Sequence, residues 1–234
     1  MFSFRDQLVF VGGDIGLGQM TDRISLLGRG YNLQLGTLPF GLSSQCMVGI
    51  NEDTFVITGG YESGYIWDKT YIMTLGEEQN SQIVMTQFDE GPNMLSARSD
   101  HACGLLEEED GRKFVVVAGG IHCARTCSVL PGWWWSHGSV ECLEVTNGVI
   151  GSWQTCPDFP LNVTQSAMVT DPNTGDLLLL GGAYSDIGIS YEPLDTIYRL
   201  TSISKGWELI DQNLMQTRTG HVAFSVSEEH LKCD

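Results

Sequence analysis

The sequence predicts an all-β fold in which a four-stranded antiparallel unit occurs four times along the chain. The first observation is a set of four short apolar runs, each ending in two adjacent glycines: LVFVGG at residues 8–13, TFVITGG at 54–60, KFVVVAGG at 113–120 and LLLLGG at 177–182. Such a run is typical of a strand buried on both faces. Two glycines after it suit a tight turn with positive φ where another backbone passes close by.

The second observation is the spacing of these pairs, which are Gly12 and Gly13, Gly59 and Gly60, Gly119 and Gly120, and Gly181 and Gly182. Their first members stand at positions 12, 59, 119 and 181, so the steps are 47, 60 and 62 residues. Self-similarity at a period near 50 is typical of a stacked or radial repeat.

The third observation is that each unit holds three further strand-like runs around the glycine-terminated run. In the second unit they are QCMVGI before it and TYIMTL and SQIVMTQF after it, and in the fourth they are QSAMVT, DTIYRL and GWELI. The first and third units follow the same plan, and no segment has a convincing helical period. A four-stranded meander repeated in this way predicts a β-propeller.

At these residues the chain resembles the kelch-repeat family. The family pattern is an apolar strand ending in Gly-Gly, then a spaced Tyr, then a Trp about six or more residues later. Tyr198 and Trp207 match it in the fourth unit, and Trp153 supplies the Trp of the third. The first and second units lack that Trp and have Leu33 and Val84 in comparable strands. The resemblance implies one kelch-type propeller domain over residues 1–234, with units at about 1–40 together with 219–226, 41–97, 98–160 and 161–216.

An Arg-x-x-His element precedes the innermost strand in two units, as Arg98 with His101 and Arg218 with His221. We expect both arginines to tie neighbouring blades together, although they could instead meet acidic groups of a partner. We expect both histidines to be hydrogen-bonded core residues.

The two ends of the chain look complementary. Residues 8–11 form a second strand with no first strand before it, and residues 222–226 form a first strand with no Gly-Gly after it. We therefore expect residues 222–226 to pair with residues 8–11, so that both termini build one blade of a four-bladed ring and the protein is a monomer. The alternative is that the sequence is a piece of a larger ring, because kelch propellers usually have six or seven blades.

Composition limits the partners. The chain has 29 Asp and Glu against 12 Lys and Arg, a formal charge of -17, so it lacks the basic stripe that nucleic acids require. No run of about 18 apolar residues predicts a membrane span, and the N-terminus lacks a signal-peptide pattern. We expect a cytoplasmic protein if the N-terminus is complete, and an extracellular one if the chain is a fragment that has lost its signal peptide.

The loops between the second and third strands of each unit are the predicted binding face, together with the connections between units. Loops on a rigid scaffold are the usual place of binding residues, and Trp and Tyr are favoured anchors. The candidate partner-binding residues are Tyr61, Tyr65, Trp67, Arg125, Trp133, Trp134, Trp135, Tyr184 and Tyr191. The alternative for the three consecutive tryptophans is that they fold back over their own loop as a local core.

The cysteines fall into two groups. The third unit holds four that could form one or two disulfides, with Cys123 and Cys127 the first candidate pair and Cys142 and Cys156 the others. Cys46 and Cys103 lie in innermost strands, where we expect free buried thiols. Asn162 begins a glycosylation sequon in a connection between units, where we expect it to be exposed.

Catalytic signals are few. The sequence contains no GxSxG, phosphate-binding loop or HExxH motif. A zinc site would need an unusual spacing, with the ligands His122, Cys123, Cys127 and His137. We therefore predict a non-enzymatic scaffold, without metal or cofactor, that binds a protein or peptide. The alternative is a divergent propeller enzyme or a glycan-binding module that uses the central cavity, with or without a metal.

Overall fold

The computed structural model describes residues 2–5, 7–28, 30–77, 82–123, 134–185 and 191–225. Within these ranges the chain is all-β, as the sequence predicts, and the only helical segment is a single 3₁₀ turn at Thr146–Gly148. No helix in the described ranges is long and apolar enough to span a membrane.

Four antiparallel sheets of four strands follow one another along the chain, and each keeps its strands in sequence order. Sheet 1 consists of β1 (Phe2–Phe4), β2 (Gln7–Val11), β5 (Arg23–Gly28) and β6 (Tyr31–Thr37). Sheet 2 consists of β7 (Cys46–Gly49), β8 (Thr54–Thr58), β11 (Thr70–Glu77) and β12 (Ile83–Glu90). Sheet 3 consists of β13 (Ala102–Glu107), β14 (Lys113–Ala118), β17 (Val140–Glu144) and β18 (Trp153–Cys156). Sheet 4 consists of β20 (Ala167–Thr170), β21 (Leu177–Leu180), β24 (Ile197–Leu200) and β25 (Trp207–Leu209).

Smaller hairpins connect the second and third strands of each sheet. They are β3 (Asp14–Gly16) with β4 (Gln19–Met20), β9 (Tyr61–Glu62) with β10 (Tyr65–Ile66), β15 (Ile121–Cys123) with β16 (Trp134–Ser136), and β22 (Ala183–Tyr184) with β23 (Glu192–Pro193). A short strand before sheet 4, β19 (Val163–Thr164), also pairs with β22.

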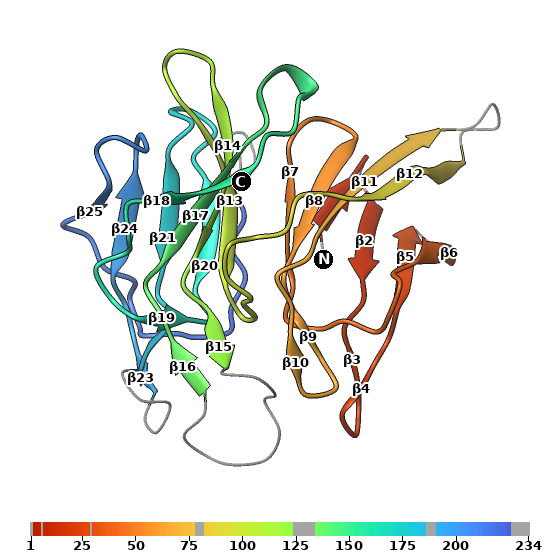
Figure 1. Cartoon of the computed structure of the whole chain (residues 1–234), viewed down its shortest axis with the longest axis horizontal. Helices are drawn as coiled ribbons and strands as arrows, with labels where there is room; N and C mark the ends of the chain where they lie inside the picture. The colour runs from red at the N-terminus through yellow and green to blue at the C-terminus, as the bar shows by residue number, and fades with distance from the viewer. Residues whose placement is uncertain are drawn as a thin grey trace, which may run out of the picture.

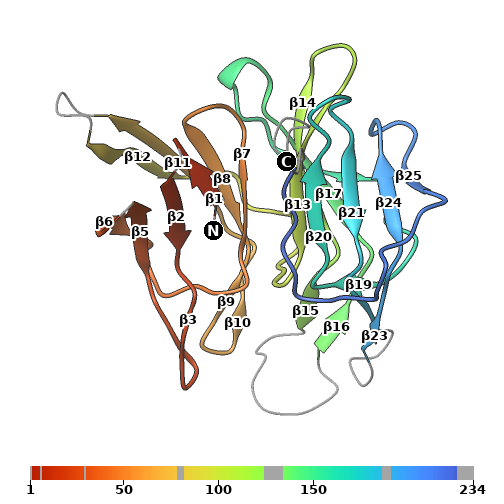
Figure 2. The ribbon, with the colours of Figure 1, turned by 180° about the vertical axis from the view of Figure 1, so that it is seen from behind.

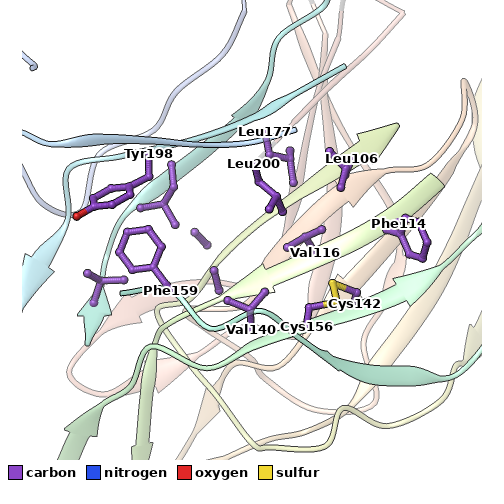
Figure 3. Packing of buried hydrophobic residues seen from close by; sticks show 14 residues of the cluster. Leu106, Phe114, Val116, Val140, Cys142, Cys156, Phe159, Leu177, Tyr198 and Leu200 are labelled. Carbon is purple, nitrogen blue, oxygen red and sulfur yellow. A yellow bond between two sulfur atoms is a disulfide. The ribbon is translucent and has the colours of Figure 1, made fainter. Parts of the chain in front are cut away.

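The four sheets stand side by side in chain order, and both views show this arrangement (Figures 1 and 2). The first strand of sheet 3, β13, contacts the first strands of both neighbouring sheets, β7 and β20. Apolar side chains fill the space between consecutive sheets. Figure 3 shows this between sheets 3 and 4, where Val116 and Val140 face the same core as Leu177, Leu200 and Tyr198.

The glycine pairs have the conformation that the sequence predicts, because all eight glycines have positive φ. Each pair also approaches the start of the next unit. The backbone N–H of Gly60 donates to the carbonyl oxygen of Arg98 at 2.9 Å, and that of Gly120 donates to Val163 at 2.8 Å. A side chain at Gly59 would overlap the Arg98 carbonyl oxygen, so only glycine fits there.

The expected pairing of the two termini is wrong. Strand β2 is hydrogen-bonded to β1 on one side and to β5 on the other, so it has no free edge for residues 222–226. The first strand of sheet 1 is the three-residue segment Phe2–Phe4, in which Phe4 is buried against Phe55. Residues 221–225 belong to no strand, and Val226 lies outside the described residues.

The second unit lacks the repeat Trp, as the sequence indicates, but its fourth strand β12 has an aromatic residue at the equivalent register position. Phe88 pairs with Met73 in sheet 2 as Trp153 pairs with Leu143 in sheet 3 and Trp207 with Leu200 in sheet 4. Phe88 stacks on Tyr71 with ring centroids 5.3 Å apart. The aromatic position is therefore kept in sheet 2.

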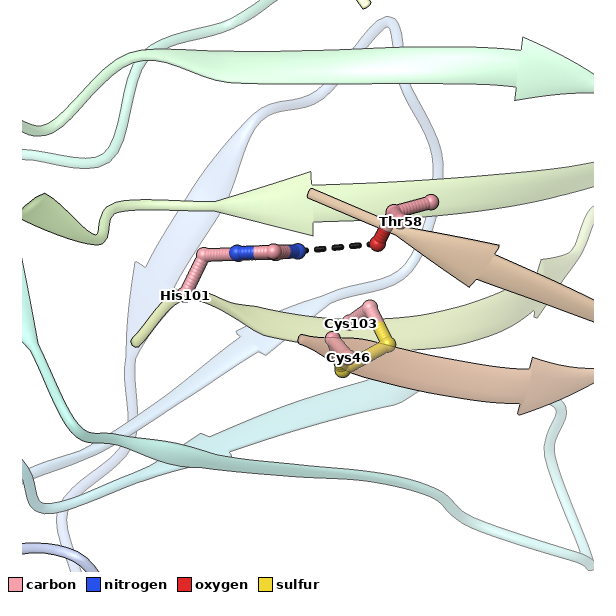
Figure 4. Close-up of a disulfide and its surroundings, with 4 residues drawn as sticks. All are labelled: Cys46, Thr58, His101 and Cys103. Atoms are coloured by element: carbon pink, nitrogen blue, oxygen red, sulfur yellow. Dashed lines mark hydrogen bonds between the residues drawn. A yellow bond between two sulfur atoms is a disulfide. The ribbon is translucent and has the colours of Figure 1, made fainter. Parts of the chain in front are cut away.

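Cys46 and Cys103 are not the free thiols that we expected. They form a disulfide between β7 of sheet 2 and β13 of sheet 3, with a Cα–Cα distance of 6.0 Å (Figure 4). The physical reason is that the first strands of neighbouring sheets lie next to each other. Cysteines 57 residues apart in sequence thus come within bonding reach.

Candidate functional site

All four small hairpins project from the same end of the molecule, at the bottom of Figure 1. We call this end the hairpin end. Its hairpins carry exposed apolar side chains: Ile15 and Leu17 on the β3–β4 hairpin, Tyr65 on β10 and Tyr191 just before β23. Exposed apolar groups gathered on one face favour a binding surface.

The hairpin end is also acidic. Asp14 and Glu192 are exposed on the β3–β4 and β22–β23 hairpins, and Glu62 is partly exposed on β9. With a formal charge of -17 on the whole chain, this end suits a ligand that carries positive charge.

The predicted anchors differ in how far their side chains are exposed. Tyr65 and Tyr191 are exposed, whereas Trp67 is only partly exposed and stacks on Phe40 with centroids 4.9 Å apart. Trp67 also has a buried indole nitrogen, so it supports the base of its hairpin from inside. Trp135 is partly exposed and lies 6.1 Å from the His122 ring.

The remaining predicted anchors divide into three cases. Tyr61 and Tyr184 are partly exposed at the bases of their hairpins, where Tyr61 bridges to Ser43 and Tyr184 pairs with Val163. Trp134 has its backbone in β16. Arg125 and Trp133 lie outside the described residues.

Four residues that sequence reasoning missed form a hydrogen-bonded chain from unit to unit; we call Ser44, Asp100, Gln165 and Gly220 the junction residues. The N–H of Asp100 donates to Ser44 at 3.0 Å, that of Gln165 to Asp100 at 2.8 Å, and that of Gly220 to Gln165 at 2.9 Å, in each case to the carbonyl oxygen. All four have left-handed backbones, with φ between 53° and 63°. Ser44, Asp100 and Gln165 lie just before the first strands of sheets 2, 3 and 4, and Gly220 has the corresponding position in the segment after sheet 4.

The junction contains one perturbed carboxylate. Burial raises the pKa of Asp100, while hydrogen bonds from the hydroxyls of Ser44 and Ser99 act in the opposite direction. Beside it, the Thr219 hydroxyl donates to the Gln165 side chain at 2.8 Å. The junction therefore offers carboxylate, amide and hydroxyl groups within a small area.

A sequence signal for the junction does exist. The tetrapeptides SSQC, SDHA, TQSA and TGHV begin at Ser43, Ser99, Thr164 and Thr219, and each has a hydroxyl residue first and the left-handed residue second. The second position varies in chemistry, so a search for identical residues overlooks it. In two of the four, the third position reaches the preceding sheet: Gln45 bonds the Val11 carbonyl, and His101 bonds Thr58 at 2.8 Å (Figure 4).

The two arginines of the Arg-x-x-His elements differ in environment. Arg98 is completely buried, and its guanidinium reaches the Gly119 and Ser139 carbonyls and the Glu141 carboxylate of sheet 3. Its own carbonyl accepts the N–H of Gly60 in sheet 2, so Arg98 joins the two sheets. Arg218 is exposed, and His221 is partly exposed.

The proposed zinc ligands do not form a metal site. Cys123 is disulfide-bonded, so it cannot supply a thiolate, and Cys127 lies outside the described residues. The rings of His122 and His137 are 6.3 Å apart. Among the described residues, no group of three or more His, Cys, Asp or Glu side chains could hold a metal ion.

The surroundings of His137 strongly lower the pKa of its ring. Burial, followed by the charges of Arg98 and His122, lowers its pKa to about 3. Its Nδ1 lies 2.5 Å from the Ser139 hydroxyl. Burial and the charges of Arg98 and His137 also lower the pKa of His101. Both rings are therefore neutral at physiological pH and act as hydrogen-bonding parts of the scaffold.

The predicted disulfide and glycosylation residues have different outcomes in the structure. Cys142 and Cys156 form a disulfide between neighbouring strands of sheet 3, whereas the predicted pairing of Cys123 with Cys127 stays a prediction. Asn162 is only partly exposed rather than fully exposed as we expected, because its carbonyl accepts the N–H of Ser185 and the following residues form β19.

Comparison with solved structures finds chains of similar fold. No protein-family model matches the chain, and no curated protein matches it. The solved structure of YjhT is similar, with a TM-score of 0.60 and 12% sequence identity over 82% of this chain and 53% of the YjhT chain. The chain thus spans about half the length of that structure, and at this identity the likeness concerns the fold alone.

Proposed function

We propose that the protein is a non-enzymatic binding module of kelch-type β-propeller architecture, whose hairpin end captures a protein or peptide. Four consecutive four-stranded sheets with glycine pairs in register support the architecture, each sheet corresponding to one blade. In this proposal sheet 1, built from β1, β2, β5 and β6, is the first blade.

The observation that carries the binding function is the exposure of Leu17, Tyr65 and Tyr191 on separate hairpins at one end. Each hairpin is fixed at its base by backbone bonds, such as those between Ser43 and Tyr61 and between Ser99 and Ile121. A rigid base lowers the entropy cost of binding, because fewer groups must be ordered on association. The acidic side chains between the anchors favour a partner with both aromatic or aliphatic and basic residues.

Selection from a displayed random peptide library tests this function. We expect the wild-type protein to enrich peptides that combine Arg or Lys with apolar residues, and the Leu17→Ser, Tyr65→Ala double variant to lose at least about tenfold in affinity for them. Such a loss is ordinary for removal of two interface anchors. Val149→Ser is the matched control, because Val149 is an exposed apolar residue in the β17–β18 connection, away from the hairpins. Equal binding by all three proteins would refute the hairpin end as the binding surface.

A second candidate rests on the junction residues. Asp100, Gln165 and Thr219 provide the carboxylate, amide and hydroxyl groups that bind sugar hydroxyls, which favours a glycan ligand at the junction. A glycan array screened with wild type and with Gln165→Ala separates the candidates. Glycan binding that depends on Gln165 and not on Tyr65 would replace the peptide-binding proposal.

A further inference from the structure

The strand before each glycine pair turns its side chains alternately toward the next sheet and toward the previous one. Counting back from the pair, residues one and three positions before it face the next sheet, and we call these forward residues. Residues two and four positions before it face the previous sheet, and we call these backward residues. In sheet 2, for example, Val56 packs in the core shared with sheet 3, whereas Phe55 and Ile57 pack in the core shared with sheet 1.

The three interfaces between consecutive sheets use the same combination of forward and backward residues. Between sheets 1 and 2, the forward residues Val9 and Val11 pack with the backward residues Phe55 and Ile57. Between sheets 2 and 3, Val56 packs with Val115 and Val117. Between sheets 3 and 4, Val116 and Ala118 pack with Leu177 and Leu179. None of these side chains is more than 6% exposed. One packing solution is therefore used three times within the chain.

The outer face of sheet 1 has the backward residues without a sheet against them in the described part of the chain. Leu8 and Phe10 are 38% and 37% exposed, although their counterparts in the other sheets are buried. Together with Leu27 and Ile15 on neighbouring strands, Phe10 lines a groove of about 600 Å³. The backward surface that is covered at the three inner interfaces is thus uncovered on the outer face of sheet 1.

The outer face of sheet 4 has the complementary forward residues. Leu178 and Leu180 occupy the positions of Val116 and Ala118, and both remain partly exposed. The segment that follows sheet 4 also has exposed apolar side chains. Within that segment, Val222 and Phe224 are each 77% exposed.

This segment is held as the start of every later unit is held. Gly182 donates its N–H to the Arg218 carbonyl at 2.8 Å, as Gly60 does to Arg98, and Gly220 donates to Gln165 as Asp100 does to Ser44. The apolar residues 222 and 224 thus stand where the next interface of the series begins.

We propose that sheet 4 of one copy of the chain docks on sheet 1 of a second copy, head to tail. The forward face of sheet 4, with Val222 and Phe224, meets the backward face of sheet 1, with Leu8 and Phe10. The occupant is a second copy because these two surfaces are the register counterparts of the surfaces that already pack together three times in each chain. The contact joins two different patches, so it is heterologous and either closes into a ring or continues as a filament.

Two blocked variants test the contact. Leu8→Ser with Phe10→Ser removes the sheet 1 surface, and Val222→Ser with Phe224→Ser removes the sheet 4 surface. All four positions are exposed, so the substitutions leave the buried core intact. Sedimentation equilibrium and light scattering of the full chain measure the mass over a concentration series.

We expect wild type and the Val149→Ser control to form dimers or larger assemblies, and each blocked variant alone to associate at least about tenfold more weakly. Because each variant keeps one intact surface, an equimolar mixture of the two should form a one-to-one complex. Recovery in the mixture also proves that both variants are folded. A wild-type protein that stays monomeric at all concentrations overturns the proposal, as does a mixture that fails to associate while both variants have native circular dichroism.

Discussion

The guanidinium of Arg98 and the carboxylate of Glu141 lie 2.6 Å apart, and their side chains are 0% and 3% exposed. Glu141 also accepts the backbone N–H groups of Leu95 and Ser96. The pair thus organises the connection that leads from sheet 2 into sheet 3. A buried ion pair contributes little net stability compared with apolar residues, but removing one partner leaves an uncompensated charge in the core.

Arg98→Met should therefore lower the free energy of unfolding by about 3–5 kcal/mol. The exposed arginine of the other Arg-x-x-His element gives a matched control, and Arg218→Met should change stability by less than about 0.5 kcal/mol. Urea unfolding followed by tryptophan fluorescence measures both. Equal effects of the two substitutions would contradict the assignment of Arg98 as the joint between sheets 2 and 3.

Removal of the disulfide between sheets 2 and 3 should destabilise the protein. The Cys46→Ala, Cys103→Ala double variant opens a loop with a sequence separation of 57, and we expect a loss of about 2–4 kcal/mol. The Cys142→Ala, Cys156→Ala variant opens a separation of only 14 and should lose less, because the unfolded chain gains less freedom. Thermal unfolding under non-reducing conditions compares them. Detection of free thiols at Cys46 and Cys103 in the native protein would refute the bond.

Two glycines with positive φ separate the effect of backbone conformation from that of crowding. Gly64 has φ of 96° with open space around it, so Gly64→Ala should cost about 1–2 kcal/mol from conformation alone. Gly59 has φ of 58° and faces the Arg98 carbonyl, so Gly59→Ala should cost clearly more. Chemical denaturation of the two variants provides the comparison. If both lose the same stability, the close approach of the next unit is not what requires glycine at position 59.

The protein should lose stability on mild acidification. The folded pKa of His137 is about 3, below the ordinary value of 6.5, so the unfolded chain takes up a proton as the pH falls below 6.5 while the folded protein does not. Stability from this neutral ring is fully present above pH 6.5 and decreases as the pH falls toward 3. The slope is up to about 1.4 kcal/mol per pH unit for one such histidine.

His137→Gln should remove the contribution of one titrating group to the slope of unfolding free energy against pH, and leave the contribution of His101. Urea unfolding at pH 7.5 and at pH 5 measures the slopes, and NMR titration of the ring protons follows the pKa directly. A His137 resonance that titrates near pH 6.5 would disprove the burial of this ring.

The sequence predicts the features that depend on local pattern. The glycine pairs and the four-stranded units follow from apolar runs and turn residues, and the structure contains both in the described residues. The sequence does not predict the small hairpins, because their two- and three-residue strands lie in segments that it predicts to be loops. Phe2–Phe4 escapes such reasoning because three residues are too few for a periodic signal. The Cys46–Cys103 bond and the exposure of Leu8 depend on which sheets become neighbours, and this information is not local in sequence.

The junction residues have a consequence for how the binding surface can change during evolution. Their links from unit to unit run through main-chain N–H and carbonyl groups, and the four side chains are as different as Ser, Asp, Gln and Gly. A substitution at one of these positions therefore replaces a side chain without removing the main-chain hydrogen bonds between units. The side-chain chemistry next to the hairpin bases can thus vary one unit at a time on an unchanged scaffold.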